Sequence, residues 1–393
     1  MYNQYFYGLG SAKSCIRELF EYGLQQAAVV GKENVFDFSL GNPSIPAPPA
    51  VNEAAIDIIK NEDSLLVHGY SSAPGFADAR DAVAKELAER TGTEIHGADL
   101  YFTCGAAPAL IAVCKALNID SNTEILAVAP FFPEYRPFVE STGSKFVYVP
   151  ADTENFQIDL KTLEAMINEH TQAVIINSPN NPSGVVFSRE TLEKVAAILT
   201  KKSEELGRPV YLISDEPYRE LVYDGVEVPW VPSIYKDTLV CYSYSKSLSL
   251  PGERIGYVYV PEKMTDAKEM FAAIAGASRV IGHVCPPTLI QRVVARCAYE
   301  KPDLKAYDVN RKLLYNGLKK IGYECASPDG AFYLFVKAPG GDGKAFSEKC
   351  KLKNLLVVPS DDFGVEGYFR LCYCVAKETI EKSLPIFEEV FNA

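Results

Sequence analysis

Short apolar runs alternate with longer amphipathic stretches through the middle of the chain. Residues 76–90 and 189–206 have the spacing of apolar positions that is typical of helices. The apolar runs occupy residues 124–132, 145–150, 173–179, 210–216, 238–245 and 254–260. Several of them are apolar throughout, as in strands that are covered on both faces. This order predicts βαβ units and an α/β fold with a mostly parallel sheet between helices.

The two ends of the chain show a different pattern, which predicts a smaller α+β unit. A helical stretch at 15–30 and a strand at 35–41 open the chain, and two long helical stretches follow residue 290. Further apolar segments lie at 331–336, 355–360 and 368–374, before a last helix that ends near Phe391. Because 393 residues exceed what one core usually supports, we expect a small domain made from 1–48 and 291–393 around a large domain at 49–290.

Charge and composition exclude several classes of partner. The net charge of −12 argues against binding to nucleic acid or to an anionic membrane surface. The N-terminus lacks the features of a signal peptide, and no stretch reaches the roughly 18 apolar residues that a membrane helix needs. The ten cysteines lack metal-ligand spacing. We therefore expect a cytoplasmic protein with free thiols, no metal, no membrane and no nucleic acid.

A lysine directly follows one of the apolar strands. Ser243, Ser245 and Lys246 end the run at 238–246, and Arg254 lies eight residues after the lysine. At the end of a buried strand, desolvation favours the neutral amine that a Schiff-base nucleophile requires. The serine hydroxyls and the arginine could bind a phosphate. Taken alone, a lysine at a strand end is more often a solvated surface residue.

A carboxylate follows another strand. Asp215 comes after the apolar residues 210–214, and Tyr218 lies three residues further on. The carboxyl ends of parallel strands are where α/β proteins bind ligands, and Asp215 could pair there with a protonated pyridine nitrogen. Tyr218 could direct its hydroxyl at a ring oxygen. A helix N-cap or a metal ligand is the alternative for Asp215.

Two loops complete the candidate site. The strand at 173–179 runs into a loop rich in Asn and Pro, in which Asn181 could hydrogen-bond a ring oxygen, although such a composition also suits an ordinary turn. Gly105, Ala106 and Ala107 lead from an apolar run into a helix, so that backbone amides could approach a phosphate. No dinucleotide or P-loop fingerprint is present.

In this order and spacing, the four motifs resemble the class I and II aminotransferase family of fold-type I pyridoxal phosphate-dependent enzymes. The resemblance runs from about Asp37 to Tyr373. It implies a homodimeric aminotransferase that moves an amino group between an amino acid and a 2-keto acid, on aspartate or aromatic substrates. It further implies that Lys246 forms the Schiff base, that Asp215 pairs with the ring nitrogen, and that the phosphate is held by Gly105, Ala106, Ala107, Ser243, Ser245 and Arg254.

The resemblance extends to residues around the substrate. It implies that Asn181 and Tyr218 contact the ring oxygen, that Phe132 stacks on the cofactor, and that Arg370 binds the substrate α-carboxylate while Gly41 lines the substrate side. Tyr70 would reach the phosphate of a neighbouring subunit. The chain departs from aspartate-specific relatives at Ala107, where some of them have a lysine, which puts dicarboxylate specificity in doubt; Arg17, Arg136 or Arg279 could substitute.

Two other functions fit parts of this pattern. A carbon–sulfur β-lyase would use the same lysine, aspartate and arginine, and the sequence does not separate it from a transaminase. A non-catalytic regulator that binds pyridoxal phosphate is more remote, because the N-terminal segment is too short for an added DNA-binding domain and the chain is acidic.

Overall fold

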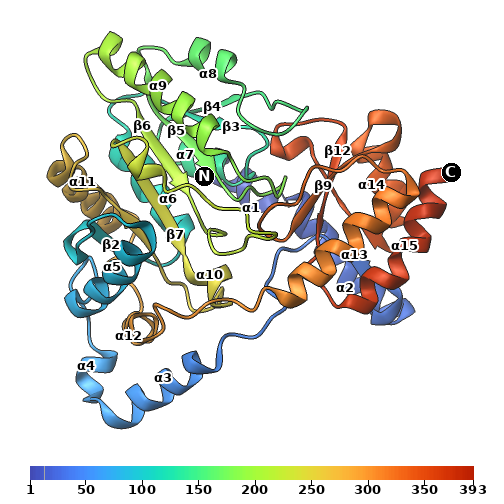
Figure 1. Ribbon diagram of the computed structural model, residues 1–393, viewed down its shortest axis with the longest axis horizontal. Helices are drawn as coiled ribbons and strands as arrows, with labels where there is room; N and C mark the ends of the chain where they lie inside the picture. Colours follow the sequence, from blue (N-terminus) through green and yellow to red (C-terminus); the bar gives the residue numbers. More distant parts are fainter. Residues whose placement is uncertain (13) are drawn as a thin grey trace.

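A seven-stranded sheet forms the centre of the larger unit (Figure 1). The computed structural model describes residues 1–12 and 14–393. The strands lie in the order β2-β8-β7-β6-β5-β3-β4, and only the pairs made by β8 are antiparallel. Their bounds are β2 Leu100–Thr103, β3 Glu124–Val128, β4 Lys145–Val149, β5 Thr171–Asn177, β6 Tyr211–Asp215, β7 Thr238–Ser243 and β8 Gly256–Tyr259. The predicted mostly parallel sheet is confirmed.

Helices cover both faces of this sheet, because alternate side chains of each buried strand point to opposite sides. On β3, Ile125 and Ala127 pack under one helical layer, whereas Leu126 and Val128 pack under the other. The first layer contains α6 Ala106–Leu117, α7 Tyr135–Glu140 and α11 Ala267–Val280. The second contains α8 Leu160–Met166 and α9 Arg189–Leu206, and over β2, β7 and β8 it continues with α3 Pro49–Asn61, α5 Ala77–Thr91 and α12 Thr288–Arg296.

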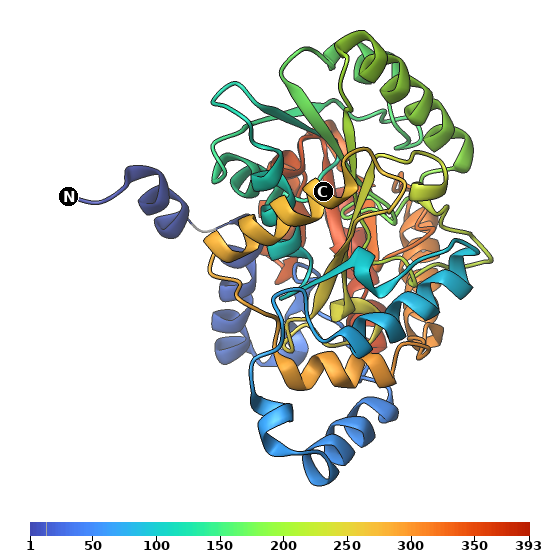
Figure 2. The ribbon, with the colours of Figure 1, turned by 90° about the vertical axis from the view of Figure 1, so that its left-hand side faces the viewer.

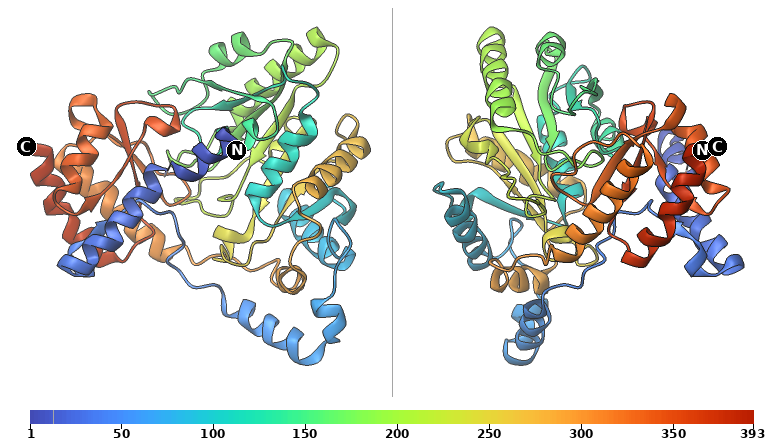
Figure 3. Two further views of the ribbon diagram at one scale, coloured as in Figure 1. Left: turned by 180° about the vertical axis from the view of Figure 1, so that it is seen from behind. Right: turned by 45° about the vertical axis from the view of Figure 1, so that its right-hand side comes forward.

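The two ends of the chain form the smaller unit, as predicted. β1 Phe36–Asp37 pairs in parallel with β10 Leu355–Leu356, and Leu19 of α2 packs on Leu356, Val358 and Phe363. Figures 1 and 3 show α2 beside the C-terminal helices. The other elements are α2 Cys15–Val30, the antiparallel strands β9 Tyr333–Lys337, β11 Val358–Pro359 and β12 Tyr368–Cys372, and helices α13 Lys305–Ile321, α14 Gly343–Lys351 and α15 Lys377–Asn392.

The remaining elements are short. α1 Gln4–Ser11 was not predicted; Asn3 caps it by accepting hydrogen bonds from two backbone amides, and Figure 2 shows it projecting from the body of the protein. α4 Ser64–His68 follows α3, and α10 Tyr244–Ser247 follows β7. Single 3-10 turns lie at Lys32–Asn34, Gly97–Asp99, Val231–Ser233, Pro339–Gly341 and Asp361–Phe363. Across the described ranges 1–12 and 14–393, no helix has both the length and the apolar character to cross a membrane.

The fold brings the polar strand ends together at one edge of the sheet. The register pairs Asn177 with Asp215, and Asp215 with Cys241, so that β5, β6 and β7 end side by side. The small unit faces this edge, because Arg370 on β12 hydrogen-bonds Asn181 in the loop after β5. The exact division of the chain at residues 48 and 290 stays a prediction; α12 packs on α3 and α5 of the larger unit.

Candidate active site

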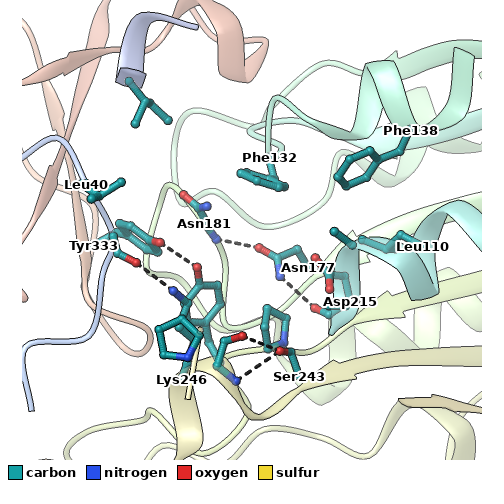
Figure 4. A pocket seen from close by; sticks show the side chains of 18 of the residues that line it. Leu40, Leu110, Phe132, Phe138, Asn177, Asn181, Asp215, Ser243, Lys246 and Tyr333 are labelled. Atoms are coloured by element: carbon teal, nitrogen blue, oxygen red, sulfur yellow. Dashed lines mark hydrogen bonds between the residues drawn. The ribbon is translucent and has the colours of Figure 1, made fainter. Parts of the chain in front are cut away.

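A cavity of about 290 Å³ lies where the carboxyl ends of the strands meet the small unit (Figure 4). Both units contribute to its wall. Twelve of the fourteen residues expected from the sequence line it: Gly41, Ala106, Ala107, Phe132, Asn181, Asp215, Tyr218, Ser243, Ser245, Lys246, Arg254 and Arg370. Gly105 lies directly behind Arg254. Tyr70 is elsewhere on the chain and is 90% exposed.

Lys246 enters the cavity from α10, which begins as soon as β7 ends. Its Nζ donates a hydrogen bond of 2.8 Å to the carbonyl oxygen of Gly41. Burial lowers the pKa of Lys246 to about 8, although the nearby thiols of Cys374 and Cys372 oppose the shift. A neutral, nucleophilic amine is therefore accessible near physiological pH.

Asp215 is a buried acidic residue in the wall of the cavity opposite Lys246 (Figure 4). The residue is 4% exposed, and its Oδ2 accepts a hydrogen bond of 2.5 Å from the Tyr135 hydroxyl. Within residues 1–12 and 14–393 its Oδ1 has no hydrogen-bond partner. Burial raises the pKa of Asp215 to about 7, with the Tyr135 hydrogen bond acting in the opposite direction and Glu216 adding to the rise. A cationic N–H donor placed against Oδ1 would satisfy this carboxylate.

A chain of hydrogen bonds joins the strand ends to the small unit. Asn177 Nδ2 donates to the backbone oxygen of Asp215 at 2.8 Å, and the backbone N–H of Asn181 donates to Asn177 Oδ1 at 2.7 Å. Arg370 Nη1 then donates to Asn181 Oδ1 at 3.0 Å. These bonds fix Asn181 between the cavity floor and the guanidinium group.

Arg370 presents a buried cation to the cavity. It is 2% exposed, its Nη2 donates to the Ser39 carbonyl oxygen at 2.5 Å, and the rings of Tyr333 and Phe363 lie 4.8 and 5.2 Å from its guanidinium carbon. No acidic side chain of the described chain forms an ion pair with it. A buried guanidinium without a carboxylate is suited to bind one from a ligand.

Two tyrosines on facing elements meet beside Lys246. The hydroxyls of Tyr218 and Tyr333 are 2.7 Å apart. Tyr333 lies so close to Gly41 that a Cβ at that glycine would collide with the phenol. Glycine at position 41 thus allows the backbone carbonyl that receives Lys246 to approach Tyr333.

The fourth wall is suited to an oxyanion. Gly105 has a φ of +95°, and α6 begins at the next residue, so the first amides of that helix face the cavity edge. A Cβ at Gly105 would lie 2.8 Å from Arg254 Nη2. Arg254 itself has a φ of +54°, and the hydroxyls of Ser243 and Ser245 are 2.7 Å apart beside it. Positive-φ backbone at a non-glycine residue is a cost that is concentrated at functional sites.

The sequence alone did not single out three residues of this site. Tyr135 lies in helix α7 and Tyr333 lies in the apolar strand β9. No local motif indicates that their hydroxyls contact site residues. Asn177 could have been found, because it ends β5 at the same edge as Asp215. The remaining lining is apolar and includes Ile16, Leu40, Leu110 and Phe138.

The chain belongs to the aminotransferase class I and II family, and the sequence model of this family matches residues 33–385. It is 30% identical to aromatic-amino-acid aminotransferase 2 of Thermococcus litoralis, over 96% of this chain and 95% of that protein. It is also 30% identical to an aspartate aminotransferase of Pyrococcus abyssi, over 96% of this chain and 95% of that protein.

Solved structures of aminotransferases share the fold. An amino transferase of Eubacterium rectale is 53% identical, with a TM-score of 0.98 over 100% of this chain and 98% of that one. Aspartate aminotransferase of Thermus thermophilus, determined with maleate, is 26% identical, with a TM-score of 0.84 over 96% of this chain and 97% of that one. The protein is a pyridoxal phosphate-dependent aminotransferase of fold type I.

The geometry fits this cofactor. The unpartnered Oδ1 of Asp215 matches a protonated pyridine nitrogen, and the wall formed by Gly105, Ser243 and Arg254 matches a phosphate. Lys246 lines the same cavity, with its pKa lowered toward neutrality. When bound, pyridoxal phosphate supplies a ring that withdraws electrons from the substrate carbon.

Proposed function

We propose that this enzyme is a homodimer that transfers amino groups from L-amino acids with apolar or aromatic side chains to a 2-keto acid. We infer the substrate class from the distribution of charge in the cavity. Its only cationic side chains, within residues 1–12 and 14–393, are Lys246, Arg254 and Arg370. Each has a task in the reaction, which leaves no cation in the cavity lining of the subunit itself for a second substrate carboxylate.

The chemistry rests on Lys246 and Asp215. Lys246 would hold the cofactor covalently through its amine, and once released it would carry the proton removed from the substrate α-carbon. Asp215 keeps the pyridine nitrogen protonated, and Tyr135 orients that carboxylate. Asn181 and Tyr218 would hold the ring oxygen, and Phe132 would pack on the ring. The phosphate would be held by Gly105, Ala106, Ala107, Ser243, Ser245 and Arg254.

Arg370 orients the substrate. Its planar guanidinium can form two parallel hydrogen bonds to the α-carboxylate, which places the α-carbon above Lys246. In support, Arg370 is buried, is held by Ser39 and Asn181, and faces the same cavity as the lysine. Gly41 lines the substrate side, where its carbonyl oxygen already contacts Lys246.

Apolar residues remain for the substrate side chain. Leu40 and Phe132 lie on opposite sides of the cavity in Figure 4, and Ile16 and Phe138 also line it. Arg136 lies outside the lining, where it contacts Glu140 and the Phe146 ring. A relative named for aromatic amino acids is consistent with this preference, although others are named for aspartate.

The homodimer is supported by the surface that carries Tyr70. Leu65, Leu66 and Tyr70 are large apolar or aromatic residues on α4 and the loop after it, and all three are exposed. Val280 and Val284, before α12, are exposed as well. Contiguous exposed apolar groups favour a protein interface. A subunit docked there could receive Tyr70 at its own phosphate site. The ten cysteines are free thiols, which supports a location in the reducing cytoplasm.

A half-reaction screen tests the substrate class. The holoenzyme is mixed with each of the twenty amino acids without a keto acid, and loss of the aldehyde form of the cofactor is followed by visible absorbance. We expect phenylalanine, tyrosine, leucine and methionine to react at least about tenfold more efficiently than aspartate and glutamate, because a buried carboxylate without a partner is costly. A preference for aspartate would contradict the proposal.

Two further results sharpen this screen. Ala107→Lys should raise the reactivity of aspartate relative to phenylalanine, while Lys194→Ala on the exposed face of α9 should leave the ratio unchanged. Without a keto acid, a transaminase stops after the first half-reaction, because the amino group has no acceptor. Continued turnover with release of ammonia from cysteine-like substrates would identify a β-lyase instead.

A further inference from the structure

A second cavity of about 290 Å³ lies on the other side of the segment that carries Lys246. Ser243, Ser245 and Lys246 face the active site, whereas Tyr242, Tyr244, Ser247 and Leu248 line the second cavity. For Tyr242 and Ser243 this division follows from the geometry of β7, in which successive side chains point to opposite faces, and the residues of α10 continue it on both sides. The two cavities therefore share one wall, formed by the end of β7 and α10.

The opposite wall of the second cavity is the connection between the two units. Residues 297–302 and 304 line it, and Figure 1 shows the chain passing below α10 on its way from α12 to α13. α5 contributes Glu86 and Arg90, and the segment after β6 contributes Arg219 and Glu220. The volume is at the lower end of the roughly 300–1,000 Å³ that is usual for small-molecule sites.

Charged groups of both signs line this cavity, and two of them are incompletely paired. Arg219 is 8% exposed; its Nε contacts Glu216 Oε2 at 2.5 Å and its Nη1 donates to the Tyr257 hydroxyl at 3.1 Å. Glu220 Oε1 accepts from Arg90 Nη1 at 2.7 Å. Across the described chain, Arg219 Nη2 and Glu220 Oε2 are buried without a hydrogen-bond partner. Buried charged atoms without a partner are costly. Arg219 Nη2 therefore favours an anionic ligand group, and Glu220 Oε2 favours a cationic one.

The acidic side of the cavity favours a cation in addition. Burial raises the pKa of Glu86; Arg90 opposes the shift, and Glu220 adds to it. Arg90 lies between the two carboxylates, with its Nε 3.0 Å from Glu86 Oε1 and its Nη1 2.7 Å from Glu220 Oε1. Glu220 Oε2 therefore remains as the acceptor for an ammonium group. The rings of Tyr242, Tyr244 and Tyr257 supply a flat, partly apolar surface, and Tyr242 and Tyr257 stack with centroids 4.9 Å apart.

We propose that this second cavity binds a small zwitterion with an aromatic or apolar body, of the size of an aromatic amino acid. The ligand carboxylate pairs with Nη2 of Arg219, its ammonium pairs with Oε2 of Glu220, and its body packs on the tyrosines. Because α10 and the connection 297–304 form the walls, an occupied cavity contacts both the lysine segment and the joint between the units. The site is a binding site distinct from the one that carries out transfer.

Trp230 provides a reporter for this site. It is the only tryptophan of the chain, and the guanidinium carbon of Arg219 lies 5.2 Å from its ring centroid. Holoenzyme loaded with pyridoxamine 5′-phosphate is titrated with L-phenylalanine, because that cofactor form has no aldehyde for an amine to attack. We expect a saturable change in Trp230 fluorescence. Phenethylamine and 3-phenylpropanoate, which lack one charged group each, should bind at least about tenfold more weakly.

Variants separate this site from the active site. Glu220→Gln removes one charge and Ala298→Phe fills the cavity, so both should weaken L-phenylalanine binding at least about tenfold, whereas Glu193→Gln on the exposed face of α9 should leave it unchanged. Arg370→Ala, which affects only the active site, should retain the fluorescence response. Loss of the response in Arg370→Ala, its persistence in Ala298→Phe, equal binding of the three probes, or no response in the millimolar range would overturn the proposal.

Discussion

Tyr135 donates a hydrogen bond of 2.5 Å to Oδ2 of Asp215 and leaves Oδ1 of the same buried carboxylate without a partner among the described residues. One oxygen is thus fixed by the protein, and the other is available to the cofactor. This relationship accounts for the raised pKa of Asp215, about 7, since burial of a half-paired carboxylate disfavours its charge. It also leads to a prediction about the cofactor-free protein.

Asp215→Asn should stabilise the apoenzyme at pH 8 and not at pH 4. Because the folded pKa is raised above that of the unfolded chain, near 3.9, the folded state binds more protons between about pH 4 and pH 7, and stability falls as pH rises through that window. The amide has no such charge to bury. Melting temperatures of the two apoproteins at pH 4 and pH 8 measure this effect. The exposed Asp303→Asn is the control, and a lower melting temperature for Asp215→Asn at pH 8 would contradict the account.

The rate at which the apoenzyme captures pyridoxal phosphate should rise with pH around a midpoint near 8. The neutral amine of Lys246 is the nucleophile, and burial lowers its pKa to about 8 from the usual value near 10.4. Borohydride trapping of the covalent product at a series of pH values measures the rate. Lys246→Ala should give no trapped product and no turnover. A reducible link in that variant would identify another lysine as the attachment site.

Arg370→Lys should weaken the binding of every amino acid by a similar factor, about 10- to 100-fold, because lysine replaces a planar pair of donors with a point charge. Values of kcat/KM for phenylalanine, leucine and alanine measure the effect, with phenethylamine as a substrate analogue that lacks the carboxylate. Arg136→Lys is the matched control, since Arg136 lies outside the cavity lining. A loss confined to acidic substrates would assign Arg370 to the side chain instead.

Tyr135→Phe should lower kcat by about tenfold while it leaves KM nearly unchanged, because a hydrogen bond to a charged group contributes about 1.5–3 kcal/mol and orients Asp215 without touching the substrate. The pH at which the absorbance of the bound cofactor changes should also shift, which a purely structural role of Tyr135 would not produce. Tyr148→Phe, at a half-buried tyrosine that packs against the same hydrophobic cluster, serves as the control. If the pH dependence of the cofactor absorbance is unchanged in Tyr135→Phe, Tyr135 does not position Asp215.

Mixed dimers of Lys246→Ala and Tyr70→Ala chains should recover activity that neither parent has. If Tyr70 serves the neighbouring site, one site of the mixed dimer carries both lesions and the other carries neither, so mixing should restore up to about half of the wild-type activity per mixed dimer. Unfolding and refolding of the chains together, followed by an activity assay, tests this. Absence of recovery in mixed dimers that are shown to form, or a fully active monomer, would reduce Tyr70 to a surface residue.

The sequence determined the fold and most of the cavity. Largely apolar runs at 173–179, 210–216 and 238–245 predicted strands covered on both sides. The ends of parallel strands meet at one edge, which brings Asn181, Asp215 and Lys246 together. The helix at Cys15–Val30 was also predictable, since Ser14 caps it and Gly31 ends it with positive φ. Local periodicity and strand-end position carry this information.

Tertiary structure alone decided the contacts between residues far apart in the chain. Tyr135 reaches Asp215 across 80 positions and Arg370 reaches Asn181 across 189, and no local pattern specifies such pairs. The second cavity is of the same kind, because α5, the end of β7 and the connection 297–304 surround it only after the sheet has formed. The pKa values of Lys246 and Asp215 likewise follow from burial, which depends on how the two units pack and not on the neighbouring residues in sequence.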